Sequence, residues 1–203
     1  MIARLGLIGF VLLVLGACST GAPVPEDRFY QLDPGMPAVS PKVILKGGLS
    51  IAHIGADPLR GGRAILYRNQ NRPLELARYH YEFWAEQPPR MIQRALQDAL
   101  RQSGIIDRVE IEGQRPHFRY ELKVDVRRFE SLVGAGRSQA DIELEVVLRT
   151  TRNDVPVWTK VYRKQNDAIP GDMHALANAM QQGLEQIFEQ LAEDLKAAET
   201  NDN

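Results

Sequence analysis

The sequence predicts an α+β fold: a mostly antiparallel sheet covered by two helices, that is, a two-layer α/β sandwich. Residues 118–127 and 140–149 alternate apolar residues with mostly charged ones at period two, as in antiparallel strands with one face in water. Residues 88–103 and 172–198 instead repeat apolar residues at helical spacing. Because an open antiparallel sheet needs a cover on one face, we expect the helices to pack on the sheet.

Length and charge limit the organisation and the partners. A chain of 203 residues favours one folded domain, which we place at residues 28–199. With 25 Lys+Arg against 26 Asp+Glu, the net charge is −1, so the protein has no basic field for nucleic acid. One cysteine excludes an internal disulfide and a cysteine-rich metal site.

Apolar residues are concentrated at the start of the chain. Arg4 supplies a positive charge, residues 5–15 are uncharged and largely apolar, and the small residues Gly16 and Ala17 follow. A charged start, an apolar middle and a small-residue end are the three parts of a secretory signal peptide. The run is shorter than the ~20 apolar residues of a transmembrane helix. We therefore predict a signal peptide over residues 1–17.

The only cysteine, Cys18, stands where cleavage is expected. Leu15-Gly16-Ala17-Cys18 resembles the bacterial lipoprotein box, in which the cysteine becomes the lipid-modified first residue of the mature chain. One acyl chain binds a membrane marginally, whereas two or more hold stably. Ser19 follows, and by resemblance to enteric sorting signals this implies the periplasmic face of the outer membrane of a Gram-negative bacterium. A secreted protein with a chance cysteine is the alternative.

The first part of the mature chain is predicted to be a tether followed by strands. Residues 18–27 are small, polar and proline-containing, without periodicity, which indicates a lipidated tether. Residues 28–32 and the apolar run 49–54 favour strands. Residues 64–67 and 74–81 flank an Asn-Gln-Asn turn and predict a hairpin.

The second part contains the strongest periodicities. Pro88-Pro89 suits the first turn of a helix, and Gly104 suits its end. Residues 131–138 are expected to form a long hairpin loop between the two alternating strands. Centring the hairpin near Gly134 pairs Arg127 with Asp141 and Lys123 with Glu145, although Arg119 then faces Arg149.

A third strand and a long helix complete the chain. Asn153-Asp154 is expected to turn the chain into a strand that carries Val155, Val157, Thr159 and Val161. The last helix, with Asp172 as its N-cap, carries a continuous apolar stripe. We expect the stripe to pack across the sheet, and its regularity leaves self-association into a homo-oligomer as the alternative.

The motif search identifies no catalytic, cofactor or metal site. The four histidines are scattered singly, and neither an H-E-x-x-H nor a G-x-S-x-G motif occurs. Gly134-Ala135-Gly136 lies between two strands and opens no helix, so it favours a hairpin loop over a phosphate-binding loop. Glu143 and Glu145 lie beside basic residues and suit a solvated charge ladder better than a glycosidase pair. We therefore predict that the protein is not an enzyme.

An aromatic cluster precedes the first helix. Tyr79, Tyr81, Phe83 and Trp84 fall within six positions. In a regular strand the first three share one face, while Trp84 lies on the other. Tyrosine and tryptophan favour interfaces, so we take these four as candidate partner-binding residues, with core packing as the alternative.

Five segments of the chain carry a resemblance to a known family: the lipid box at Cys18, residues 29–32, residues 62–68, Phe83-Trp84-Ala85-Glu86 with Pro88-Pro89, and Ser103-Gly104. Together they resemble the family of auxiliary lipoproteins of ABC-type transport systems, which includes paraquat-inducible protein C. The resemblance covers nearly the whole mature chain, and Trp-Ala-Glu-x-Pro-Pro is its most specific stretch.

This resemblance implies a non-enzymatic adaptor. Family members work with mammalian-cell-entry domain proteins, which carry phospholipid-like molecules between the two membranes and connect to inner-membrane transport components. Only Cys18 takes a defined role from the family. Two alternatives remain open: an outer-membrane lipoprotein that serves as assembly factor or chaperone for lipopolysaccharide or barrel proteins, and a lipid-anchored hydrolase.

Overall fold

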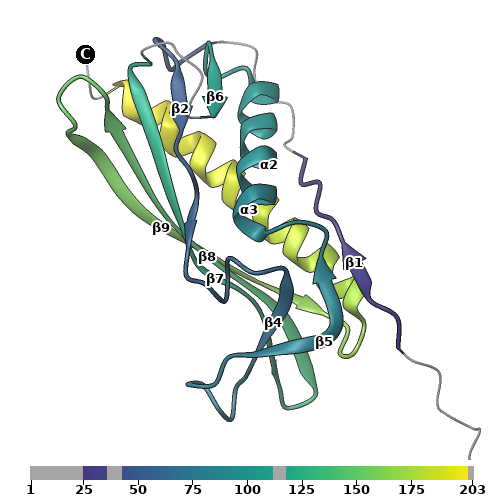
Figure 1. Ribbon diagram of the computed structural model, residues 1–203. Helices are drawn as coiled ribbons and strands as arrows, with labels where there is room; N and C mark the ends of the chain where they lie inside the picture. The colour runs from purple at the N-terminus through teal and green to yellow at the C-terminus, as the bar shows by residue number, and fades with distance from the viewer. Residues whose placement is uncertain (1–24, 36–42, 112–117, 201–203) are drawn as a thin grey trace, which may run out of the picture.

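The computed structural model describes residues 25–35, 43–111 and 118–200, with side chains to residue 198. It is an α+β fold with one mixed sheet and two helices, α2 (Pro88–Ser103) and α3 (Met173–Thr200) (Figure 1). The predicted signal peptide and Cys18 lie outside the described residues. The strands are β1 (Arg28–Tyr30), β2 (Leu49–Ile51), β3 (Gly55–Ala56), β4 (Ala64–Asn69), β5 (Ala77–Trp84), β6 (Val109–Ile111), β7 (Tyr120–Gly134), β8 (Arg137–Thr150) and β9 (Pro156–Ala168).

Strand β7 is the axis of the sheet. On one side it pairs with β8, which pairs with β9, and both of these long ladders are antiparallel. Along its other side, β2 and β3 pair in parallel with the first half of β7 and β4 with the second half. Strand β5 then joins β4 in the predicted antiparallel hairpin, and β1 and β6 are added in parallel at the outer edges. The prediction of a mostly antiparallel sheet is therefore correct for the long ladders, whereas the short strands add in parallel.

The β7–β8 hairpin is tighter than predicted. The strands continue to Gly134 and Arg137, so only Ala135 and Gly136 form the turn, and both have positive φ, 49° and 72°. Two central residues of positive φ match the right-handed twist of the flanking strands. The long loop expected over residues 131–138 is thus wrong.

The expected pairing across this hairpin is also wrong. Lys123 faces Val147, and Asp141 faces Glu130, because the turn is centred between Ala135 and Gly136, one and a half residues later than expected, and a bulge follows Val126. Other ion pairs take the place of the expected ones. Arg149 meets Glu121 at 2.5 Å and Arg127 meets Glu145 at 2.8 Å, so opposite charges still stabilise the wet face.

Strand β9 forms where it was predicted but extends further. Its predicted valines do not enter the core: Val155, Val157 and Val161 are exposed. The alternate residue Tyr162 is buried instead, and Trp158 packs against the core. Helix α3 covers the face that carries Tyr162 and Trp158, which decides the inward side of this edge strand.

Both helices begin and end as the sequence indicates. Gly104 ends α2 in the left-handed conformation, φ 64°. Asp172 caps α3, because its Oδ1 accepts a hydrogen bond of 2.9 Å from the Ala175 amide. Gln93 of α2 donates to the Ala52 carbonyl and so joins this helix to the segment after β2.

The apolar stripe of α3 packs on its own protein. The helix runs along β8 and β9 and also contacts α2. Seven stripe residues are buried in the single described core cluster and one, Met173, packs against it. The buried residues are Leu176, Met180, Leu184, Ile187, Leu191, Leu195 and Ala198. Intramolecular packing of the stripe is confirmed.

Candidate functional site

The chain enters the fold from the predicted tether at β1, beside β5. Arg28 forms an ion pair of 2.5 Å with the buried carboxylate of Glu82. Burial, together with a hydrogen bond to Glu82, raises the pKa of Tyr30. The Ala85 amide donates to the Tyr30 carbonyl at 2.7 Å. These contacts attach the start of the folded chain to the β4–β5 hairpin, which lies in the same end of the molecule in Figure 1.

Strand β5 is interrupted by a bulge at Tyr81. Leu66 of β4 faces Arg78, yet Ala64, two residues earlier, faces Phe83, so β5 contains extra residues. Tyr81 takes up this excess with a φ of 60°, a left-handed conformation that costs a residue with a Cβ roughly 1–2 kcal/mol. The common face expected for Tyr79, Tyr81 and Phe83 is therefore wrong, since the bulge turns Tyr81 outward.

The four aromatic residues consequently have different surroundings. Trp84 is buried, with its ring centroid 5.2 Å from that of Phe129. Tyr79 packs against the core, and its ring centroid lies 4.7 Å from that of Tyr67. Burial raises the pKa of Tyr79. Trp84 and Tyr79 thus contribute mainly to the core.

Tyr81 and Phe83 offer aromatic surface to the outside. The Tyr81 side chain is 43% exposed, and Phe83 is half-buried. The ring of Phe83 stacks on Phe29 of β1 at 5.8 Å between centroids. An exposed residue in a strained backbone conformation is a reason to look for function at this position.

A groove of about 740 Å³ lies beside this aromatic segment, between the turn that follows β3, strand β4 and strand β5. We call it the β4–β5 groove. Its walls are largely apolar, with a basic contribution from Arg63, Arg78 and His80. The apolar lining includes Pro58, Leu59, Leu66, Leu76 and Phe83. Tyr81 does not line the groove.

The two arginines of the groove have no carboxylate within 4 Å among the described residues. The Nε of Arg63 donates to the Trp84 carbonyl at 3.1 Å, and its guanidinium lies 5.1 Å from the centre of the Phe29 ring. These contacts hold Arg63 in place, and its charge adds to those of Arg94 and Arg90 in lowering the pKa of Glu86. Arg78 is exposed on β5.

A buried ion cluster holds the groove's turn against the sheet. The Glu130 side chain of β7 is fully buried, and its two oxygens accept from Arg60 at 2.7 Å and Arg68 at 2.6 Å. Arg60 also binds Asp57 at 2.6 Å, and the Asp57 carboxylate accepts from the Leu59 amide. Burial of the Asp57 carboxyl acts to raise its pKa, but the hydrogen bonds from Arg60 outweigh this effect and lower the pKa. Sequence analysis missed Glu130, because in the chain it looks like one more charged residue of a strand.

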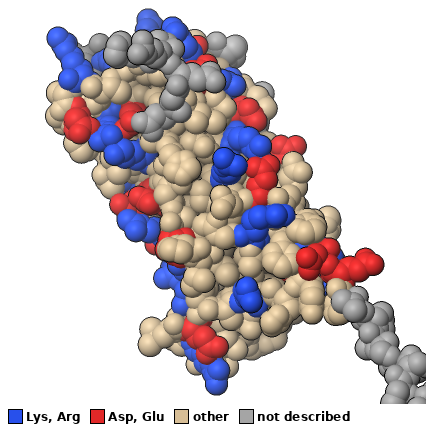
Figure 2. Space-filling view, in the orientation of Figure 1, with Lys and Arg blue, Asp and Glu red and all other residues tan. Residues whose placement is uncertain are grey.

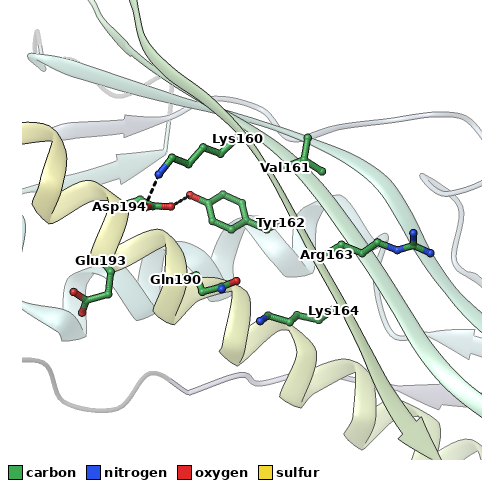
Figure 3. A pocket seen from close by; sticks show the side chains of 8 residues that line it. All are labelled: Lys160, Val161, Tyr162, Arg163, Lys164, Gln190, Glu193 and Asp194. Atoms are coloured by element: carbon green, nitrogen blue, oxygen red, sulfur yellow. Dashed lines mark hydrogen bonds and ion pairs between the residues drawn. The ribbon is translucent and has the colours of Figure 1, made fainter.

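A second hollow, of about 750 Å³, lies between edge strand β9 and α3. Figure 3 shows Lys160 and Tyr162 extending from β9 toward Asp194 of α3. Asp194 accepts from Lys160 Nζ at 2.5 Å and from the Tyr162 hydroxyl at 2.6 Å. Burial and Asp194 raise the pKa of Tyr162, so its hydroxyl stays protonated. This cluster connects the edge strand to the helix.

A search of the described parts of the chain for metal-binding side chains gives a negative result. Over residues 25–35, 43–111 and 118–200, no three His, Cys, Asp or Glu side chains gather in a way that would hold a metal ion. Within the same ranges, no helix has the length and hydropathy to cross a membrane.

Comparison with known proteins identifies the family of this chain and solved structures that share its fold. A family model described as the ABC-type transport auxiliary lipoprotein component matches residues 30–192. The protein XCC0632 from Xanthomonas campestris is 25% identical, with a TM-score of 0.74 over 86% of this chain and 98% of that one. The hypothetical protein CT253 from Chlamydia trachomatis shares the fold at 7% identity and a TM-score of 0.53, over 76% of this chain and 98% of that one. No curated protein matches the chain.

Proposed function

The chain belongs to the family of ABC-type transport auxiliary lipoprotein components, and from this premise we propose that it is a lipid-anchored adaptor of a lipid transport system at the periplasmic face of the outer membrane. The observation that carries the proposal is the family match over residues 30–192, which spans most of the folded chain. The family serves transport as an auxiliary component and is not an enzyme family.

The anchor is assigned to Cys18. The sequence places this cysteine directly after a predicted signal peptide, and the chain from Cys18 to β1 is ten residues long. At ~3.3–3.6 Å per residue such a segment reaches at most roughly 35 Å. The folded body therefore stays close to the leaflet that holds the acyl chains.

The partner in this proposal is a mammalian-cell-entry domain protein, which connects the adaptor to an ABC ATPase and permease in the inner membrane. Tyr79, Tyr81, Phe83 and Trp84 are the proposed contact region. The exposed Tyr81 and the half-buried Phe83 supply the surface, while the packed Tyr79 and Trp84 support it.

Affinity capture of the lipidated protein from solubilised membranes tests the proposal. The expected result is enrichment of a mammalian-cell-entry domain protein together with transport components. Enrichment of lipopolysaccharide-transport or barrel-assembly proteins in their place would contradict it and favour the alternative function.

Replacing Cys18 by alanine is expected to leave an uncleaved precursor, because lipid transfer to the thiol precedes removal of the signal peptide in lipoprotein maturation. The measurement is the intact mass of the protein recovered from the membrane fraction, with the wild-type chain as control. A variant that is processed normally and released as soluble protein would show that Cys18 is not the anchor.

Tyr81→Ala is expected to weaken recovery of the protein partner at least several-fold, since an exposed tyrosine at the centre of an interface is a frequent hot spot. Alanine keeps a Cβ at the same positive φ, so the free energy of unfolding should change by less than ~1 kcal/mol. Val161→Ala, which truncates an exposed valine on β9, is the matched control. Equal recovery of both variants would remove Tyr81 from the partner surface.

A further inference from the structure

We propose that the β4–β5 end of the molecule is a second, peripheral membrane contact, in which Arg63 and Arg78 bind phosphate groups of phospholipids while Leu59 and Leu74 enter the interfacial layer. The inference rests on the proposed anchoring at Cys18, because it concerns the leaflet that holds the acyl chains. It assigns an orientation to the folded body, which a tether alone does not impose.

The location of this end relative to the anchor supports a membrane contact. Phe29 lies two residues after Asp27, the last residue of the tether. Phe29 pairs with Phe83, and Phe83 lines the groove. The anchored chain therefore joins the fold beside the groove. The β8–β9 turn lies at the opposite end of the molecule, near the end of α3 in Figure 1.

The charges at the groove fit an anionic occupant. Most other arginines in the described parts of the chain are paired with a carboxylate, as Arg60 and Arg68 are with Glu130. Arg63 and Arg78 are not, although both lie on the groove. Basic and acidic side chains are interspersed over much of the face in Figure 2, in keeping with the net charge of −1. Unneutralised guanidinium groups bind phosphate oxygens in a planar, bidentate way.

The apolar side chains of this end fit the boundary of a bilayer. Leu74, in the loop between β4 and β5, is 98% exposed, Leu59 is 59% exposed and Phe29 is 55% exposed. Large apolar side chains that are so exposed mark interaction sites when they gather. Leucine and phenylalanine next to basic residues are the composition that lies in the headgroup and upper acyl region. An acidic protein segment would satisfy the arginines but would leave Leu74 in water.

The test uses the lipidated full-length chain with Leu74→Cys as its only free thiol, since Cys18 is the only natural cysteine and is occupied by lipid. The new thiol carries an environment-sensitive fluorophore. The protein is reconstituted into vesicles of phosphatidylethanolamine and phosphatidylglycerol that contain a quencher-labelled phospholipid. Asn153→Cys, in the exposed β8–β9 turn, provides the control site.

Quenching at position 74 is expected to exceed that at position 153 several-fold. Adding Arg78→Glu should reduce the quenching at position 74 at least twofold, whereas Arg78→Lys, which keeps the charge but loses the bidentate guanidinium, should reduce it less. Arg78 is exposed and makes no described contact that the fold requires. Circular dichroism verifies that each variant is folded.

Vesicle flotation separates this inference from the proposed anchor. Protein that floats with the vesicles but shows equal quenching at positions 74 and 153 overturns the second contact and leaves the anchor intact. Quenching that is the same with Arg78→Glu also overturns the role of the arginine. Protein that does not float overturns the anchored function, and the second contact with it.

Discussion

Leu184→Asp is expected to unfold the folded body of the protein. Leu184 is fully buried in the middle of the α3 stripe, within the core cluster. The variant loses the leucine's apolar burial, which alone costs ~2–5 kcal/mol on truncation, and it places an unpaired carboxylate in the same site. A domain of this size has ~5–15 kcal/mol of stability in total, so the loss removes most of it.

Urea unfolding followed by circular dichroism measures this effect. Gln182→Asp is the control, because residue 182 is exposed on the same helix and the substitution introduces the same charge. We expect the control to stay within ~1 kcal/mol of the wild-type free energy of unfolding. Wild-type stability in Leu184→Asp would mean that α3 does not pack on the sheet in solution.

Glu130→Ala is expected to destabilise the protein by ~3–5 kcal/mol, the usual cost of removing one partner from a buried ion cluster. Two arginines, Arg60 and Arg68, point their guanidinium groups at this carboxylate and are themselves largely buried. Without Glu130, Arg68 loses its carboxylate partner and Arg60 keeps only Asp57, while both guanidinium groups stay largely buried. The turn that carries Arg60 should then detach from the sheet.

The same unfolding measurement checks this expectation, and amide hydrogen exchange locates it. Exchange should accelerate first in residues 57–63, since Arg60 connects this turn to β7. Glu75→Ala is the control: its ion pair with Arg72 is exposed on both sides, so its loss should cost no more than ~1 kcal/mol. Equal stability of the two variants would show that the cluster contributes nothing beyond a surface pair.

Detachment of the 57–63 turn also connects stability to the groove. Leu59, Gly62 and Arg63 belong both to this turn and to the groove wall. Glu130 is therefore a positioning residue for the β4–β5 groove, although it does not line it. In the quenching experiment, Glu130→Gln should weaken the signal at position 74, although this variant replaces no residue that lines the groove.

Local signals in the sequence were sufficient for most elements. The α3 stripe, the Asp172 cap and Gly104 act within a few residues of where they stand, and the structure confirms each of them. Strict alternation likewise identified β7 and β8. The family resemblance was also correct, since the family model covers residues 30–192.

Other features required distant partners. The bulge after Val126 and the two-residue turn at Ala135 and Gly136 shifted the hairpin register, and no local pattern marks either. Tyr81 leaves the alternation of β5 because β4 must pair with β5 on both sides of a bulge. In the same way, β9 directs Tyr162 inward because α3 covers that face.

The sequence by itself determined the two helices, the long strands β7 and β8 and the end of α2 at Gly104, because these depend on neighbours along the chain, whereas the short strands β3 and β6 were not predicted. Only the tertiary structure decided which charges are buried, which aromatic side chains stay outside and where a groove opens. Glu130 illustrates the difference: its burial depends on arginines more than sixty residues away. Contacts over such separations form only when the sheet assembles, and they set both the stability of the fold and the shape of its surface.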